Sequence, residues 1–367
     1  MITNKRYLGC HFHSIKLNSW RSLLNLLLNI LLNCLSVYGM FVYDPHNWRI
    51  ESNPFFTRVM LMTYNRIYPI LYTSIAIHYY CFGHQMIYLL DMILPYTKIN
   101  QYQQILSLIL TFISAHLNYL LLNYNNLKEL FQQTTIEKFS AQLGWYTVSI
   151  QIHLIYNMII FYQCLVESFL HSIESKLLHI NQTESIVGHP CLIYSKILKK
   201  IERVACLCKK MNHLLSNGLL IQILSIGTNM IIKFCAFVLF QKQWRIAFIE
   251  APHICLCYFY LSKISLYNLR IIKRIQMIRR LMLKSYWKYC NENRCNSTIG
   301  YRIDNDERQS DQIVVKRFDP IRFFELTNIY KNDFIVRVFR IWNMDFHFIL
   351  SITAFVINYV VFIVSTN

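Results

Sequence analysis

Long apolar runs alternate with short polar or basic segments along the whole chain. The first run, residues 22–43, contains no charged residue. A helix needs about 20 largely apolar residues to cross the hydrocarbon core of a bilayer, because every backbone polar group must be satisfied internally. Seven windows fit this pattern, namely Ser22–Tyr43, Ile67–Leu90, Gln104–Asn123, Tyr146–His171, Ser216–Phe240, Ala247–Leu269 and Phe346–Val364. The sequence therefore predicts an all-α polytopic membrane protein with seven transmembrane helices.

The distribution of Lys and Arg predicts the orientation of these spans. The N-terminal tail and the loops after spans two, four and six contain four, one, seven and sixteen of them, whereas the other three loops contain three, two and two. Basic residues collect on the cytosolic side of membrane proteins. We therefore expect the N-terminus inside, the C-terminus outside and a multi-pass location in the plasma membrane.

The loop after span four has the pattern of an amphipathic helix over about residues 191–215. Apolar residues recur at spacings of three and four from Ile193 to Leu215, while lysines and Arg203 occupy the other face. This stripe has a period of 3.5 residues and leads directly into span five. Two interpretations stay open, a helix lying on the inner leaflet and a span extended into a cytosolic helical bundle.

The long segment before the last span divides into three parts. Span six continues as a basic helical stem from Leu269 to Cys290, for which a solvated stem and a calmodulin-binding helix are the alternatives. Residues 291–312 are polar and predict a mobile linker. An amphipathic anchor helix then follows Pro320, with Phe334, Val338 and Ile341 on its apolar face. We thus predict three regions, 1–269 with the N-tail and spans one to six, 270–345 with stem, linker and anchor helix, and 346–367 with the last span.

Composition supports a membrane location. The chain is 54% hydrophobic and 15% charged, whereas soluble domains carry about 25% charge. The net charge is +18, but the basic residues alternate with apolar runs instead of forming one patch, so nucleic acid is not an expected partner. No HExxH, GxSxG, Walker, GxGxxG or CxxC motif occurs. We expect no enzymatic activity, no cofactor and no metal site.

Polar residues inside the predicted spans are the candidates for ligand recognition. Lys233 and Glu250 lie near the outer ends of spans five and six, where they form either a structural ion pair or the polar lining of a cavity. Glu167 and Lys263, near inner ends, are interpreted as structural residues. A small-molecule pocket between helices mixes aromatic and polar side chains, and such residues gather in the outer halves of the spans, among them Tyr72, Tyr119, His153, Tyr156 and His253. Hydrogen bonds between packed helices are the alternative explanation.

Three features of the chain resemble the insect gustatory receptor superfamily, including its gustatory receptor-like members. The first is the architecture, and the second is the stretch LCKKMNHLLSNGLL at residues 207–220. The third is the last span, where the family signature reads Thr-Tyr, five hydrophobic residues and Gln-Phe. In this chain Asn358-Tyr359 precedes five hydrophobic residues, and Ser365-Thr366 follows them. Tyr and the hydrophobic five match, whereas Thr, Gln and Phe do not.

The resemblance implies a chemosensory receptor that is a ligand-gated, non-selective cation channel responding to a small molecule. It further implies a homo- or hetero-tetramer of related subunits whose last span lines the pore. Phe362 then corresponds to the hydrophobic gate, Ser365 replaces the Gln near the outer pore mouth, and Asn358 and Tyr359 lie beside them. A ring of Phe side chains can close a narrow pore by dewetting.

Three other functions fit part of the pattern. A G-protein-coupled receptor also has seven spans, but its N-terminus lies outside, contrary to the basic-residue count. A transporter usually shows internal repeats or spans interrupted by Gly and Pro, which this chain lacks. A receptor-like protein that keeps the fold without chemosensing is favoured by the departures from the terminal signature.

Overall fold

The computed structural model describes residues 55–97, 136–182, 190–239, 244–297, 331–338 and 341–365, together with Leu27, Leu31, Cys34, Tyr38, Ile109 and Ile113; in parts of the helices only the backbone is described. Five long helices make up most of this part, α2 (Phe55–Ile93), α5 (Ile136–Gln182), α6 (Pro190–Leu239), α7 (Trp244–Ser297) and α9 (Phe346–Ser365). A 3₁₀ turn, η2 (Leu94–Tyr96), and two short strands, β1 (Arg337–Val338) and β2 (Trp342–Asn343), complete it. The predicted all-α class is confirmed for the described residues.

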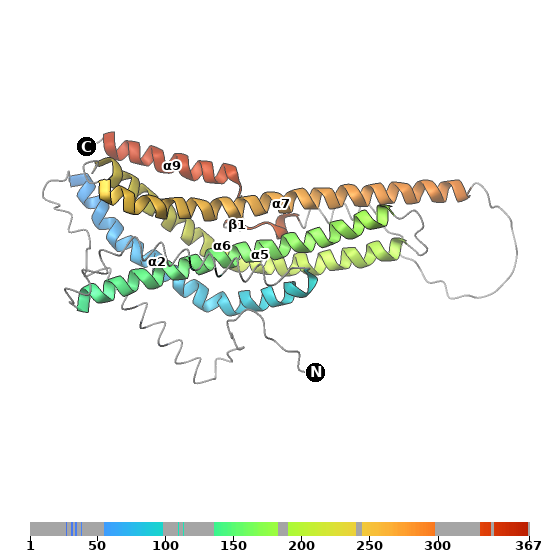
Figure 1. Cartoon of the computed structure of the whole chain (residues 1–367), viewed down its shortest axis with the longest axis horizontal. Helices are drawn as coiled ribbons and strands as arrows, with labels where there is room; N and C mark the ends of the chain where they lie inside the picture. Colours follow the sequence, from blue (N-terminus) through green and yellow to red (C-terminus); the bar gives the residue numbers. More distant parts are fainter. Residues whose placement is uncertain are drawn as a thin grey trace.

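The helices form an elongated bundle in which α2, α5 and α7 run in one direction and α6 and α9 in the other (Figure 1). At one end lie α9, the beginnings of α2, α5 and α7, and the end of α6; we call this the α9 end. At the opposite end, here called the stem end, α5 ends, α6 begins and α7 runs on to Ser297. The closest helix pairs are α5 with α7 and α2 with α6, and α9 packs mainly on α6.

The apolar stripe predicted for residues 191–215 is the buried face of α6. Ile197, Ile201, Val204, Met211 and Leu215 are each at most 5% exposed, and α6 continues without a break to Leu239. Lysines on the opposite side of this helix are exposed. The stripe therefore packs against protein, as expected of a helix within a bundle.

One buried residue of this stripe leads to a chemical prediction. Burial raises the pKa of the Cys208 thiol to about 12, with a hydrogen bond to Tyr162 lowering it and Asp333 raising it further. The thiolate is the reactive form, so at pH 8 only about one Cys208 in 10,000 is reactive. Cys206 lies two residues away and is exposed. In chains retaining a single cysteine, we expect Cys206 to react with maleimide at least about 100-fold faster than Cys208. Equal rates would show that this face of α6 is not buried.

The connection into α9 differs from the predicted amphipathic helix. Residues 331–334 are helical, but the chain then turns, and β1 pairs with β2 in an antiparallel hairpin, Arg337 opposite Asn343 and Val338 opposite Trp342. The prediction that the helix extends through Val338 to Ile341 is wrong. The backbone here bonds to side chains of α6 and α7, which replaces the hydrogen bonds a helix would have supplied.

Two boundaries predicted from the sequence also differ from those in the structure. The helix α7 runs unbroken from Trp244 to Ser297, so it crosses the predicted region boundary at residue 270 and includes residues 291–297 of the predicted linker. The sequence from His253 to Ser297 contains neither Gly nor Pro, which explains why no break occurs there. Residues 298–330 lie outside the described residues.

Not all predicted spans fall in the described part of the chain. The first and third predicted spans lie outside it except for six single positions, all of them exposed. Among the residues that the structure describes, no helix meets the combined requirement of length and apolar character for crossing a membrane.

Candidate functional site

The side chain of Asn268 on α7 holds the connector that leads into α9. Its amide nitrogen donates to the carbonyls of Val336 (3.0 Å) and Met344 (2.9 Å). Its amide oxygen accepts from the backbone N–H of Val336 (3.1 Å) and from Gln163 Nε2 (2.8 Å). Asn268 and Gln163 are both buried. Three of these hydrogen bonds fix both ends of the hairpin to α7, and the fourth joins Asn268 to α5.

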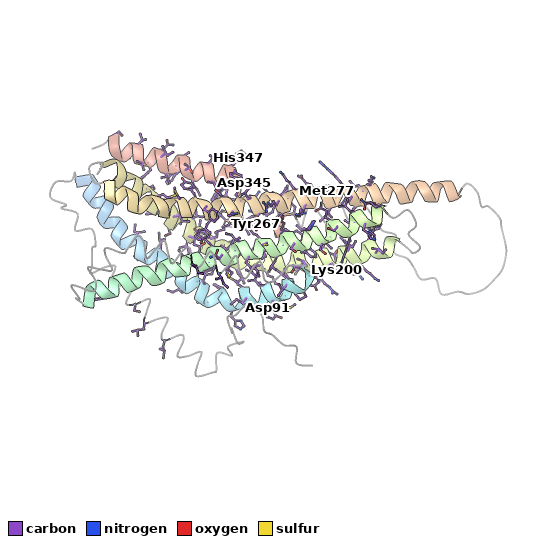
Figure 2. The ribbon with its side chains drawn as sticks, viewed as in Figure 1. Asp91, Lys200, Tyr267, Met277, Asp345 and His347 are labelled. Atoms are coloured by element: carbon purple, nitrogen blue, oxygen red, sulfur yellow. The ribbon has the colours of Figure 1, made fainter. Side chains whose placement is uncertain are left out.

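A second amide, on α6, holds the same connector. Asn212 Nδ2 donates to the carbonyl of Asp333 (2.6 Å) and to that of Ile335 (2.9 Å). Asn212 and Asn268 thus define one level across the bundle, which we call the clamp plane. Asp345, the residue after Met344, caps α9, because its carboxylate accepts a hydrogen bond from the backbone N–H of Phe348 (2.9 Å). In Figure 2, Asp345 and Tyr267 lie at about the same level along the bundle, with Lys200 and Met277 further toward the stem end.

Charged residues are distributed unevenly about the clamp plane. On the α9 side of the clamp plane, the described side chains include a single charged one beyond Asp345, that of Lys263. Its ammonium group lies 5.4 Å from the centre of the Phe259 ring. On that side, the exposed large side chains come from α2, α6, α7 and α9 and include Ile70, Ile77, Leu224, Phe259, Leu266 and Leu350. Toward the stem end, exposed Lys and Arg line α6 and α7. Among the side chains that the structure describes, the clamp plane therefore separates a largely apolar surface from a basic one.

The two faces of α9 have different chemistry. Ile349, Val356 and Val360 are buried against the bundle. The opposite face is exposed, and its midline contains the polar residues His347, Ser351, Asn358 and Ser365. Their spacings of four, seven and seven residues place them on one line along the helix. Such a polar line runs through a helix that otherwise consists mostly of Phe, Ile and Val.

The predicted gate residues belong to or border this line. Phe362 is 53% exposed, and its ring lies 6.5 Å from that of Tyr359, which stacks on Phe355 at 6.0 Å. The hydroxyl of Ser365 donates to the carbonyl of Phe362 (2.9 Å). Asn358 is exposed and makes no side-chain hydrogen bond within the described part of the chain. Asn358 and Ser365 thus lie on the polar line, whereas Phe362 and Tyr359 lie beside it.

Of the predicted ligand-binding residues, Tyr156 has a described side chain. It is buried on α5 and stacks on Tyr260 of α7, with ring centroids 5.0 Å apart and an interplanar angle of 10°. Tyr119 lies outside the described residues. The remaining five lie in helices of which only the backbone is described at these positions, namely Tyr72, His153, Lys233, Glu250 and His253.

Two buried polar residues that the sequence analysis did not select lie on α6 near this level. Gln222 is 1% exposed and Ser225 2%. Both amide atoms of Gln222 and the Ser225 hydroxyl have no hydrogen-bond partner within the described residues. Such groups are uncommon in native proteins, and each needs an explanation. Gln222 lies about 15 Å beyond Asn212, and Tyr156 about 10 Å beyond Gln163, both toward the α9 end.

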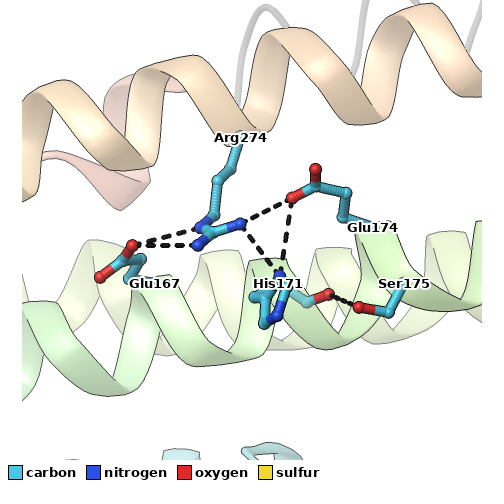
Figure 3. Close-up of polar contacts among 5 residues, drawn as sticks. All are labelled: Glu167, His171, Glu174, Ser175 and Arg274. Carbon is cyan, nitrogen blue, oxygen red and sulfur yellow. Dashed lines mark hydrogen bonds and ion pairs between the residues drawn. The ribbon is translucent and has the colours of Figure 1, made fainter.

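A charged cluster joins α5 to α7 on the stem side of the clamp plane (Figure 3). Arg274 donates to Glu167 through Nε (3.3 Å) and Nη2 (3.2 Å), and to Glu174 through Nη1 (2.8 Å). The same Nη1 lies 3.0 Å from His171 Nδ1. This arrangement agrees with the interpretation of Glu167 as a structural residue. The sequence did not reveal its partner, because Arg274 lies more than 100 residues away.

Comparison with known proteins gives no assignment. No family model matches the chain, and no curated protein matches it.

Proposed function

We propose that the chain is a multi-pass membrane receptor of the gustatory-receptor type, a ligand-gated, non-selective cation channel. In this proposal several copies, four by the family resemblance, place their α9 helices around a common pore. The observation that carries the proposal is the polar line on the exposed face of α9, opposite the face that packs on its own bundle. Isolated polar side chains facing lipid are costly, whereas the same residues facing a water-filled pore are hydrated.

Asn358 is the most informative member of the line. The hydroxyls of Ser351 and Ser365 donate to carbonyls of their own helix at 2.8 and 2.9 Å, so they tolerate an apolar environment. An amide without such a bond favours water or a partner amide. A symmetric arrangement around a pore supplies water to Asn358 and leaves the flanking Ile357 and Val361 to contact lipid or neighbouring helices.

The segregation of charge supports membrane insertion. Exposed apolar side chains cover several helices on the α9 side of the clamp plane, and patches of this kind are rare on soluble monomers. From Phe346 to Ser365, α9 spans about 29 Å, close to the thickness of the hydrocarbon core. The helix directions also agree with the expected topology, because α2, α5 and α7 run from the α9 end and α6 and α9 run toward it.

The ligand site belongs, in this proposal, to the layer of Tyr156, Tyr260, Gln222 and Ser225. Two stacked phenol rings, with a buried amide and hydroxyl at a similar level on α6, suit a small, partly aromatic or hydroxylated molecule. The contact between Tyr258 Oη and Thr353 Oγ1 (2.9 Å) joins the helix that contains Tyr260 to α9. Ligand occupancy thus has a short physical route to the proposed pore helix.

Insertion is the first property to test, because no described helix satisfies the criterion for a membrane-crossing segment. Epitope tags at the two termini should be probed in intact and in permeabilised cells. We expect the N-terminal tag to be hidden and the C-terminal tag accessible in intact cells. The reverse result contradicts both the receptor type and the pore assignment. Extraction of the chain by alkaline carbonate contradicts insertion itself.

Conduction is tested by recordings from wild type and two Phe-to-Ala variants. Loss of a hydrophobic gate should raise basal current several-fold in Phe362→Ala. Phe355→Ala is the matched control, since Phe355 is a similarly exposed aromatic residue of the same helix, 60% against 53%, and should keep wild-type basal current. Asn358→Leu should lower single-channel conductance. Surface-expressed chains that pass no current alone or with related subunits would favour the receptor-like alternative without a channel.

A further inference from the structure

Four of the basic residues on the stem side lie close to the clamp plane. Lys209 and Lys210 precede Asn212 by three and two residues, and Arg270 and Lys273 follow Asn268 by two and five. Since α6 and α7 run antiparallel, all four lie on the stem side of the clamp plane, about 3–8 Å from it. We call these four exposed residues the inner collar.

Apolar side chains lie at the clamp plane itself. On the hairpin, Ile341 is 66% and Trp342 52% exposed, although Phe334, Val336 and Val338 of the same connector are buried. The backbone around them is fixed, because Asn268 bonds to Val336 and Met344 on either side. Exposed Ile and Trp on a backbone held in this way present a rigid apolar edge to the surroundings.

The order of these groups matches one kind of partner. The polar headgroup layer of a bilayer is about 5–8 Å thick on each side, and its cytosolic face is anionic. Trp residues prefer the boundary between headgroups and hydrocarbon. We propose that the inner collar binds the headgroups of anionic phospholipids while Trp342 and Ile341 insert at the base of the headgroup layer. The inference rests on the membrane location in the proposed function, but not on conduction.

Neighbouring charges leave the collar cationic. Arg274 is engaged with Glu167 and Glu174, and Arg337 Nε donates to Asn343 Oδ1 (3.0 Å). Two acidic groups lie close to the connector. Asp345 accepts the N–H of Phe348 at the start of α9. Asp333 lies near Lys209 and Arg337; burial raises the pKa of its carboxyl, and these two cations oppose that rise. Arg270 also lies 5.6 Å from the Tyr267 ring, so its charge projects from α7 beside an aromatic side chain.

The chain provides its own matched control on α6. Lys196, Lys199, Lys200 and Arg203 are four further exposed cations. They precede Asn212 by about 13–24 Å along the helix axis. Measured from the outer edge of a headgroup layer about 5–8 Å thick, the three lysines of this set lie about 10 Å or more away, beyond the Debye length of about 8 Å at physiological ionic strength. Replacing these four residues, the distal set, by Gln removes the same four positive charges as replacing the inner collar by Gln. The distal set, however, lies too far along α6 to contact a bilayer.

The experiment uses the full chain in lipid vesicles, with Trp342 as reporter and the other five Trp replaced by Phe. Flotation first establishes insertion. Quenching is then measured with brominated phosphatidylcholine and with brominated phosphatidylserine, each labelled at shallow or deep acyl positions. We expect stronger quenching by the shallow label, and a several-fold preference for phosphatidylserine. The four-Gln collar variant should lose that preference, and the four-Gln distal variant should keep it.

Each other result overturns the proposal. Quenching of Trp342 by aqueous iodide but not by lipid means that the hairpin faces solvent. Quenching by neither means that another copy of the chain covers it. Equal loss in the collar and distal variants means that bulk charge acts, not the collar. If the single-Trp chain misfolds, a fluorophore on Ile341→Cys repeats the measurement in a chain that keeps all six Trp and has its native cysteines replaced by Ser or Ala. Failure to float defeats the membrane proposal as well, whereas an inserted chain without current leaves the lipid test intact.

Discussion

Replacing Asn268 by Asp is expected to lower the free energy of unfolding by at least about 3 kcal/mol. The amide nitrogen that donates to the carbonyls of Val336 and Met344 becomes an oxygen that repels both. The carboxyl group also loses water, because the site is buried. The hairpin would detach from α7, and α9 would lose its fixed starting point. Thermal melting of the purified chain, followed by fluorescence-detected size exclusion, measures the effect.

Asn343→Asp is the matched control for this change. Asn343 lies on the same hairpin and is exposed, and its amide oxygen accepts from Arg337 Nε (3.0 Å). A carboxylate preserves that acceptor, so stability should change by less than about 0.5 kcal/mol. If both variants melt like the wild type, Asn268 does not hold the connector. Asn268→Leu separates the two causes, because it removes the donors without adding a charge.

Replacing Gly218 by Ala is expected to destabilise the contact between α2 and α6 by about 1–3 kcal/mol. A Cβ at this position would lie 2.6 Å from His78 Cδ2 and 3.1 Å from Tyr79 Cε2. The His78 ring is not free to move away, since its Nε2–H donates to the carbonyl of Leu214 (2.9 Å). The methyl group therefore separates the two helices or breaks this hydrogen bond. The measurement is the same melting assay.

Two glycines on the same helices give the opposite expectation. A Cβ on Gly83 of α2 or Gly227 of α6 would meet nothing within 4 Å. Ala there should leave stability unchanged or raise it by about 0.5–1 kcal/mol through helix propensity. His78→Ala should rescue Gly218→Ala in a double-mutant cycle, because the clashing ring is gone. Additive losses instead of rescue would show that the two residues do not touch.

The sequence predicted the parts of the fold that depend on local periodicity. The stripe from Ile193 to Leu215 has a regular period, and the structure buries it on α6. The helical continuation of span six past Leu269 also follows from the absence of Gly and Pro, although the linker was placed too early. Local patterns specify which face of a helix is buried, because burial recurs with each turn.

The hairpin and the clamp could not be predicted in the same way. Phe334, Val338 and Ile341 have helical spacing, yet the backbone beside them bonds to Asn268, which is 68 residues distant from Val336. Likewise a Gln such as Gln222 within an apolar run is usually interpreted as a packing residue, and its lack of a partner is visible only in three dimensions. The polar line on α9 was detectable, since His347, Ser351, Asn358 and Ser365 recur at helical spacing.

The unbroken course of α7 has a mechanical consequence. Its 54 residues form a rod about 81 Å long. Arg274 joins it to α5 at about two fifths of its length from the stem end, and Tyr258 joins it to α9 at about a quarter of its length from the other end. A tilt of about 5° in such a rod moves one end by about 7 Å relative to the other. If the rod turns about the Arg274 contact, the same tilt moves the stem end by about 3 Å and the Tyr258 contact with α9 by about 2 Å. A molecule that binds α7 near Ser297 would therefore exert a larger torque about the Arg274 contact, and so on α9, than one that binds close to Arg274.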